Sequence, residues 1–261
     1  MNDNSNTYTA PRRGSASRLW ATARYYYPSI KMQIALYPGI AVLVGLTVIL
    51  AAINPGMSWL ATTATTGMSM MIYLSPASII KTVASPYQAT LPARCVERWL
   101  VPAVFFTVGT ITLTYLPFFV TLNVYDSLSA TGGAMRWFDA QEGAFSELST
   151  TWILLTETAP AALMLYGVMR FRRHTFLKSA LLIPAALAVT GFVFGFFCFY
   201  EGFKAGMEAA QNGEMANVGE YCMEITQMME SHAMTAVAGI SVVISVVFLA
   251  LSYSALKNRQ A

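Results

Sequence analysis

A single carboxylate, Glu157, falls inside a long apolar stretch of the sequence, residues 149–169. A carboxylate at mid-depth in a membrane span is costly, tends to be neutral unless paired or hydrated, and by default marks a functional site. Hydroxyl groups flank it at Thr156 and Thr158, so a proton or cation path is one interpretation. The alternative is that the span begins later and that Glu157 lies among the outer headgroups. The sequence leaves both open.

The second apolar stretch is unusually rich in hydroxyl side chains, among them Thr62 and Thr66. Small and hydroxyl residues let membrane helices approach closely and form hydrogen bonds across the contact. The same hydroxyls could line a polar path together with Glu157. Helix packing is the simpler interpretation.

Arrangements typical of enzymes are missing from the sequence. It contains no Ser/His/Asp set and no Gly-rich phosphate loop, so we expect neither catalysis nor ATP hydrolysis by this chain itself. Glu230 and His232, with Cys222 and Glu224 upstream, match no metal-ligand spacing and are better explained as a solvated acidic face. We therefore expect no metal and no cofactor.

The sequence contains six long apolar stretches. They lie near 33–53, 57–80, 99–122, 149–169, 176–200 and 233–255. About 20 apolar residues suffice for a helix to cross the hydrocarbon of a bilayer. The chain is 56% hydrophobic and only 11% charged, whereas soluble domains carry about 25% charged residues. We predict an all-α polytopic membrane protein: six transmembrane helices in one domain over 15–256, a disordered cytoplasmic tail over 1–14 and a short tail over 257–261.

The basic residues alternate from one connection to the next. Of 16, only Arg136 and Lys204 lie on one set of connections, and the other 14 lie on the N-terminal tail, the 81–98 and 170–178 loops and the C-terminal tail. Basic residues near spans stay on the cytoplasmic side. We therefore expect a bacterial inner-membrane protein with both termini inside, in contact with lipid and without a nucleic-acid partner.

The side of the membrane on which each of the three cysteines lies decides whether a disulfide is expected. Cys95 falls inside, where a disulfide is not expected. Cys198 and Cys222 both approach the outer face, and the sequence leaves a bridge between them open.

Three connecting segments have more structure than simple loops. Residues 15–31 mix aromatic and basic side chains, as in a helix that lies in the membrane interface, although an ordinary flank of the first span is the alternative. Proline favours the first helical turn, so a helix should begin near Pro92 and continue into the third span. Glu97, between Arg94 and Arg98, either forms a local ion pair or docks on a partner. Residues 201–231 predict one or two amphipathic helices lying on the outer membrane surface.

Two cytoplasmic segments carry a family resemblance. The stretch Thr90-Leu-Pro-Ala-Arg-Cys-Val-Glu-Arg-Trp99 resembles the LPAS-x-x-E-K-(F/W) signature of small six-span bacterial membrane proteins that are similar to permease subunits of type-two ATP-binding-cassette (ABC) exporters. The stretch 166–179 resembles their second signature, an aromatic and basic turn followed by F-x-K-(T/S). Arg94 replaces the serine and Arg98 the lysine of the first signature.

This resemblance implies that a separate ATPase chain docks on residues 15–31, 81–98 and 170–178, and that ATP-driven closure rocks two permease copies, in a homodimer or a paired permease. The docking residues it implies are Leu91, Pro92, Arg94, Glu97, Arg98, Arg172 and Arg173. One alternative is a non-transporting assembly or regulatory subunit that binds a partner through the acidic segment 201–231. Another is a standalone channel or carrier that uses Glu157, Thr62 and Thr66.

Overall fold

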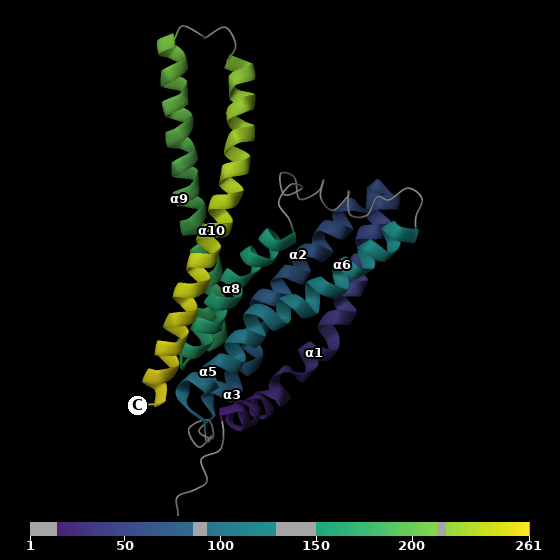
Figure 1. The fold of residues 1–261 in the computed structure, drawn as a ribbon, viewed down its shortest axis with the longest axis vertical. Helices are drawn as coiled ribbons and strands as arrows, with labels where there is room; N and C mark the ends of the chain where they lie inside the picture. The colour runs from purple at the N-terminus through teal and green to yellow at the C-terminus, as the bar shows by residue number, and fades with distance from the viewer. Residues whose placement is uncertain (1–14, 86–92, 129–149, 213–217, 261) are drawn as a thin grey trace, which may run out of the picture.

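The computed structural model describes residues 15–85, 93–128, 150–212 and 218–260 (Figure 1). Every regular element in these ranges is helical and none is a strand, which confirms the predicted all-α class. The expected disordered tail, residues 1–14, lies outside the described residues.

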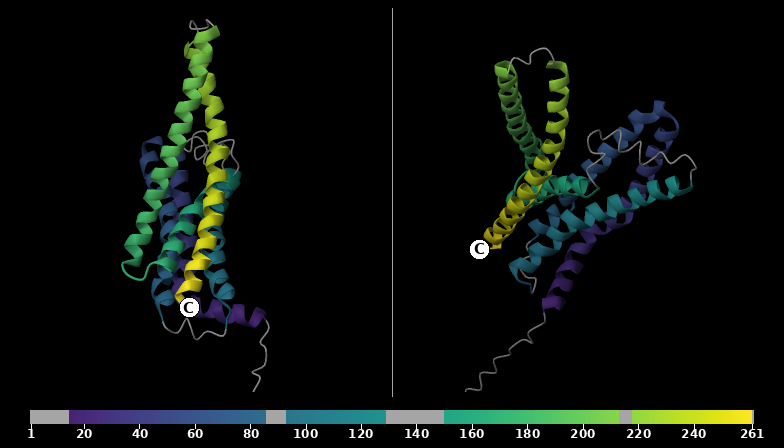
Figure 2. Two further views of the ribbon diagram at one scale, coloured as in Figure 1. Left: turned by 90° about the vertical axis from the view of Figure 1, so that its left-hand side faces the viewer. Right: turned by 45° about the horizontal axis from the view of Figure 1, so that its top comes forward.

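Helix α1 runs from Ser15 to Ile53 without interruption. It joins the predicted interfacial segment to the predicted first span in one 39-residue helix, although Pro28 and Pro38 lie inside it. A proline inside a helix removes one backbone hydrogen bond and bends the helix more often than it ends it. Figure 2 shows the first turns of α1 lying across the base of the molecule, at a steep angle to the rest of the helix.

The predicted second span is a broken helix. After a tight turn at η1, Pro55–Met57, helix α2 covers Ser58–Leu74 and gives way to the 3-10 helix η2, Ser75–Ile79, and the short α3, Ile80–Ala84. Pro76 has no N–H to donate to a preceding turn, which favours the change to 3-10 geometry at this point. The span predicted near 57–80 therefore contains a change of helix type at Ser75 that the sequence did not indicate.

The third predicted span is a continuous rod. Helix α5, Cys95–Val104, passes through a π-helical turn, η3, Phe105–Gly109, into α6, Thr110–Leu128. The rod begins four residues before the predicted span near 99–122 and ends six residues after it.

The last three apolar stretches form α8, Thr150–Arg170, α9, Thr175–Asn212, and α10, Val218–Gln260. Residues 201–212 and 218–231 continue α9 and α10, so the predicted separate surface helices do not form. Figures 1 and 2 show these ends of α9 and α10 rising beside each other beyond the remaining helices. Helix α9 alone is about 57 Å long at 1.5 Å per residue, well beyond the ~30 Å of hydrocarbon that a span must cross.

Two apolar cores hold the helices together. One lies between α1, α2 and α6 and contains Val48, Ile72 and Phe118. The other contains Tyr26, Phe106, Met169 and Leu256, and joins the first half of α1 to α5, α8 and α10. Helix α10 packs mainly against α8, and α1 mainly against α6.

Much of the outer surface is apolar. Large side chains such as Leu43, Val108 and Val243 are about 60% exposed, as expected for helices surrounded by lipid. Among the described residues, three helical segments are long and apolar enough to cross a membrane: Ser15–Ile53, Cys95–Leu128 and Ala238–Arg259. The structure is thus that of an all-helical protein compatible with a membrane.

Candidate functional site

The start of α5 is built around Glu97. Its Oε2 accepts a hydrogen bond of 2.8 Å from the backbone N–H of Arg94, the residue that precedes the helix. This bond satisfies one of the free donors at a helix N-terminus, and a negative charge there is favoured by the helix dipole. Glu97 is buried. Its ionic partner is Arg18 of α1, whose Nε lies 3.0 Å from Oε1 and 3.1 Å from Oε2.

This pairing shows that Glu97 forms an ion pair, although not with a neighbouring residue, and docking of Glu97 on a partner stays a prediction. The carboxylate takes part in an ion pair within the chain, and the partner is Arg18, 79 residues away. Of the two flanking arginines, Arg94 is exposed, and the Nε of Arg98 donates to the carbonyl of Ala93 at 2.9 Å. We name residues 93–98 the elbow. Leu91 and Pro92, which precede it, lie outside the described residues.

The first turns of α1 also contact α3. The Tyr25 hydroxyl donates to the carbonyl of Thr82 at 3.2 Å, and the hydroxyls of Ser29 and Thr82 are hydrogen-bonded to each other. The helix is therefore held at two points, by α3 and, through Arg18, by the elbow. The mixture of aromatic and basic residues in 15–31 favoured an interfacial helix but indicated no role for Tyr25 or Ser29.

On the other side of the elbow, α5 contacts α10. The indole Nε1 of Trp99 donates to the hydroxyl of Ser252 at 2.7 Å, and the Trp99 ring meets that of Tyr253 edge to face at 5.8 Å. At the end of α10, the guanidinium of Arg259 donates to the backbone carbonyl of Phe171 in the α8–α9 turn. The elbow is thus connected to α1 through Glu97, and the adjoining turn of α5 is connected through Trp99 to α10 and, through α10, to the α8–α9 turn.

The turn between α8 and α9 is tight. A Cβ added to Gly167 would lie 2.4 Å from the hydroxyl oxygen and 2.8 Å from the Cα of Ser179, so only glycine permits this approach of α8 to α9. His174 has a φ of 51°, in the left-handed region. Arg172 and Arg173 are both exposed on this turn. A constrained turn therefore presents two guanidinium groups to the outside.

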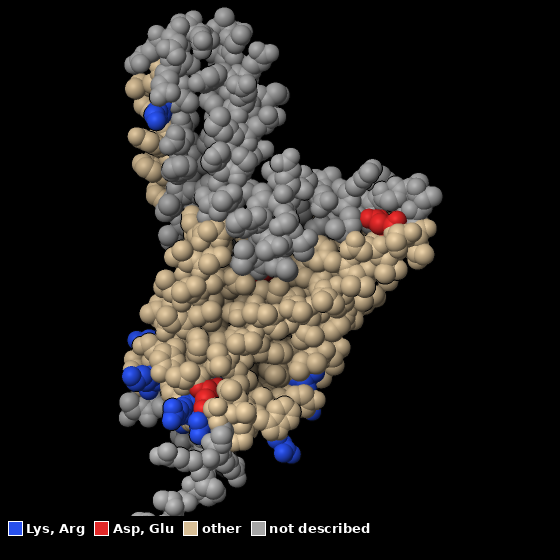
Figure 3. Space-filling model, in the orientation of Figure 1, with Lys and Arg blue, Asp and Glu red and all other residues tan. Residues whose placement is uncertain are grey.

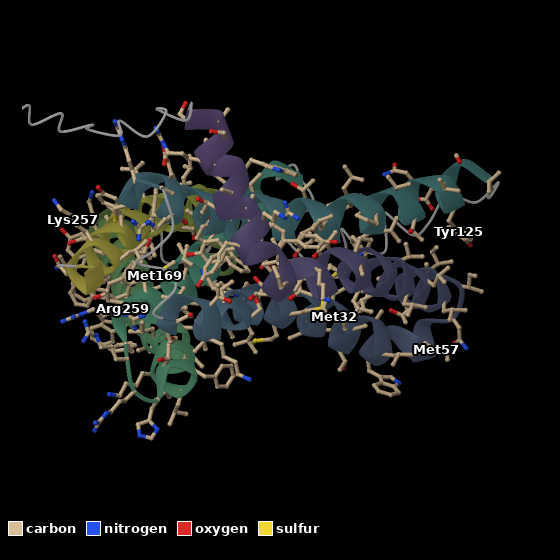
Figure 4. All side chains as sticks on the ribbon, turned by 90° about the horizontal axis from the view of Figure 1, so that it is seen from below. Met32, Met57, Tyr125, Met169, Lys257 and Arg259 are labelled. Atoms are coloured by element: carbon tan, nitrogen blue, oxygen red, sulfur yellow. The ribbon has the colours of Figure 1, made fainter. Side chains whose placement is uncertain are left out.

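Basic side chains gather at the end of the molecule that holds these contacts. Figure 3 shows Lys and Arg concentrated at this end around one acidic patch, with one basic residue far away on the α9–α10 hairpin. That residue is Lys204 of α9. In the view from below, Lys257 and Arg259 lie on the opposite side of the molecule from Met57 and Tyr125 (Figure 4). We call the region formed by the first turns of α1, residues 93–98, the α8–α9 turn and the end of α10 the basic end.

A second polar cluster lies between helices α2, α6 and α8. Glu157 of α8 is 6% exposed. Its Oε1 accepts hydrogen bonds from the Ser69 hydroxyl of α2 at 2.9 Å and from the Tyr115 hydroxyl of α6 at 3.0 Å. Next to it, the hydroxyls of Thr158 and Ser245 are 2.7 Å apart and connect α8 to α10. Glu157 therefore faces the interior of the helix bundle, where a polar side chain of a membrane helix is expected.

Thr62 and Thr66 are not part of this cluster. Both are exposed, and their hydroxyls donate to carbonyls of their own helix, those of Ser58 at 3.1 Å and Thr62 at 2.8 Å. The residue of α2 that reaches Glu157 is Ser69, which sequence analysis did not single out. Spacing alone could not have identified Ser69, because it lies three residues from Thr66 and Thr66 is exposed.

Comparison with known proteins gives no match: no family model, no curated protein and no solved structure is significantly similar to the chain. Within the described residues, no three His, Cys, Asp or Glu side chains are placed to hold a metal ion. The side chains of Cys198 and Cys222 are outside the described part, so their pairing stays a prediction. By its fold, the chain is an all-helical protein with apolar helices that are compatible with a membrane.

Proposed function

We propose that this chain is the membrane-spanning permease subunit of an ABC-type exporter, driven by a separate ATPase chain that docks at the basic end. In this proposal it lies in a bacterial inner membrane with six spans and with both termini in the cytoplasm. The observation that carries the proposal is the Arg18–Glu97 pair. It joins the two segments, 15–31 and 81–98, on which the resemblance places the ATPase.

The charge distribution supports the proposed orientation. Each of the six apolar stretches coincides with a helix or a run of helices, and the basic residues on the face drawn in Figure 3, apart from the one on the hairpin, lie toward one end. Retention of basic residues on the cytoplasmic side would place the basic end inside the cell. Arg94, Arg172 and Arg173 would then face an ATPase in the cytoplasm.

The contacts of the elbow supply a route by which a movement of the ATPase could reach the long helices. A push on the elbow would reach α1 through Arg18 and α10 through Trp99 and Ser252. Because α10 packs against α8, three long helices would move with the elbow. Two copies that rock in this way would open a path between them, without any catalytic residue in this chain.

Co-purification tests the proposal. The tagged chain, extracted from its native membrane in a mild detergent, should retain an ATPase chain. Reversing the exposed charges with Arg172→Glu and Arg173→Glu should reduce that ATPase at least tenfold, because each substitution replaces an attraction with a repulsion.

Lys204→Glu is the matched control, since it reverses an exposed charge on the α9–α10 hairpin, and it should retain the ATPase fully. If the wild-type chain carries no ATPase, or if the control and the double variant lose it equally, the proposal is wrong.

A second candidate is a non-transporting assembly or regulatory subunit, and the length of α9 and α10 favours it. These helices extend the predicted spans over residues 201–212 and 218–231 of the acidic segment. The whole segment contains Glu201, Glu208, Glu214, Glu220, Glu224 and Glu230. Deleting residues 205–228 would shorten both helices and leave the basic end intact. Loss of function with the ATPase still bound and the helical content of the remainder preserved would favour this candidate.

A further inference from the structure

The first half of α1 has one face that is turned away from the protein. Trp20, Arg24, Tyr27 and Lys31 are all exposed, and Trp20 and Tyr27 are 72% and 55% exposed. Their spacing of four, three and four residues places them along a single helix face. Two aromatic rings therefore alternate with two cations along it. We call these four residues the outer stripe.

The opposite face of the same turns is used inside the molecule. Thr22, Tyr26 and Ile30 are buried, and Tyr25 and Ser29 are bonded to α3. Burial and hydrogen bonding thus account for the inward residues, whereas the outer stripe contributes to neither core. A large exposed Trp and Tyr on one helix face need another explanation.

The orientation of these turns indicates what covers the outer stripe. They lie across the base of the molecule, while the remainder of α1 turns away from it (Figure 2). A helix that crosses the ends of apolar spans in this way lies in the plane of the lipid headgroups. Trp and Tyr are favoured at that depth because their rings are amphipathic. Lys and Arg there meet lipid phosphates.

We propose that the outer stripe binds anionic phospholipids, with Arg24 and Lys31 on the headgroup phosphates and Trp20 and Tyr27 between the adjacent chains. A docked protein is less well matched, because the stripe crosses the ends of the spans (Figure 2), where rings and cations favour the headgroup layer. The proposal depends on the membrane location of the chain but not on the ATPase.

The proposal has a structural consequence for the elbow. The helix that carries the outer stripe also carries Arg18, whose guanidinium pairs with Glu97. Anionic lipid would therefore hold α1 in the position at which Arg18 reaches the elbow.

Quenching of Trp20 fluorescence by spin-labelled lipid tests the proposal on the full chain. The chain is reconstituted in phosphatidylcholine with a small fraction of spin-labelled phosphatidylglycerol or of spin-labelled phosphatidylcholine. The Trp20 signal is the difference between the wild type and Trp20→Phe. Each cation near an anionic leaflet contributes about fivefold in affinity, so the wild type should prefer phosphatidylglycerol by more than tenfold.

Arg24→Gln with Lys31→Gln should abolish that preference. Lys81→Gln with Lys257→Gln removes the same charge from exposed positions outside the stripe and should retain most of it. Near 1 M salt the preference of the wild type should also fall, because the Debye length shrinks to about 3 Å. Equal preference in the two double variants overturns the proposal. So does a Trp20 that neither lipid quenches, which would mean that protein covers the stripe.

Discussion

At the scale of single residues, two carboxylates have defined roles. Glu97 caps the start of α5 and pairs with Arg18, and Glu157 accepts hydrogen bonds from Ser69 and Tyr115. The sequence pointed to both carboxylates because each is the lone acidic group in its surroundings. It could not find Arg18 as a partner, because a contact across 79 residues depends on how the helices pack. It also selected Thr62 and Thr66, whose hydroxyls are satisfied by their own helix.

The Arg18–Glu97 pair should show energetic coupling. The side chains are 23% and 11% exposed, so solvent screening is limited. Glu97→Gln or Arg18→Gln alone should lower the free energy of unfolding by about 1–3 kcal/mol, since each leaves a largely buried polar group with weakened partners. In a double-mutant cycle measured by thermal unfolding in membranes, the double variant should lose less than the sum of the single variants. Strict additivity would show that the pair contributes nothing.

Substitution of Glu157 distinguishes an ATP-driven exporter from a proton-coupled carrier. Glu157→Gln keeps an amide oxygen in place of Oε1, so the bonds from Ser69 and Tyr115 can persist and the unfolding temperature should change little. Glu157→Leu removes the acceptor and should cost about 1–3 kcal/mol. Under our proposal, ATP-driven activity survives in Glu157→Gln. Proton-coupled flux that Glu157→Gln abolishes would instead support the carrier.

At the scale of the elements, the apolar stretches located the helices but not their ends. The predicted spans near 176–200 and 233–255 stop where charged residues begin, whereas α9 and α10 continue through Glu, Ala and Met, which are good helix formers. Hydropathy predicts which residues contact lipid, whereas helix propensity predicts which residues are helical. The end of a predicted span therefore differs from the end of the helix. The break of α2 at Ser75 was missed because the apolar run continues through η2.

Substitution of Gly167 tests the close packing of α8 against α9. Gly167→Ala would place a methyl group against the backbone of Ser179, which cannot move aside like the end of a flexible side chain. We expect a loss of about 1–3 kcal/mol in the free energy of unfolding. Gly67→Ala on α2 is the control, because nothing lies within 4 Å of the added Cβ, and helix propensity should make it neutral or slightly stabilising. Equal stability of the two variants would contradict the packing of α8 on α9.

In the molecule as a whole, the described parts of the three segments on which the family resemblance places an ATPase lie at one end. The first turns of α1, the elbow and the α8–α9 turn are connected through Arg18, Trp99 and Arg259. Charge alternation predicted that they share a side of the membrane. It could not predict that they form one connected region, because that depends on how α10 packs against α5 and α8.

Site-specific photo-crosslinking tests whether an ATPase docks at the basic end. A photoreactive phenylalanine analogue replaces Arg173 at the basic end or, as a control, Met207, an exposed residue of α9 on the projecting hairpin. After illumination of intact native membranes, the chain labelled at position 173 should be crosslinked to a protein that binds ATP, and the yield should change when ATP is added. The chain labelled at position 207 should give no such adduct. An ATP-binding protein crosslinked equally from both positions, or from neither, would contradict ATPase docking at the basic end.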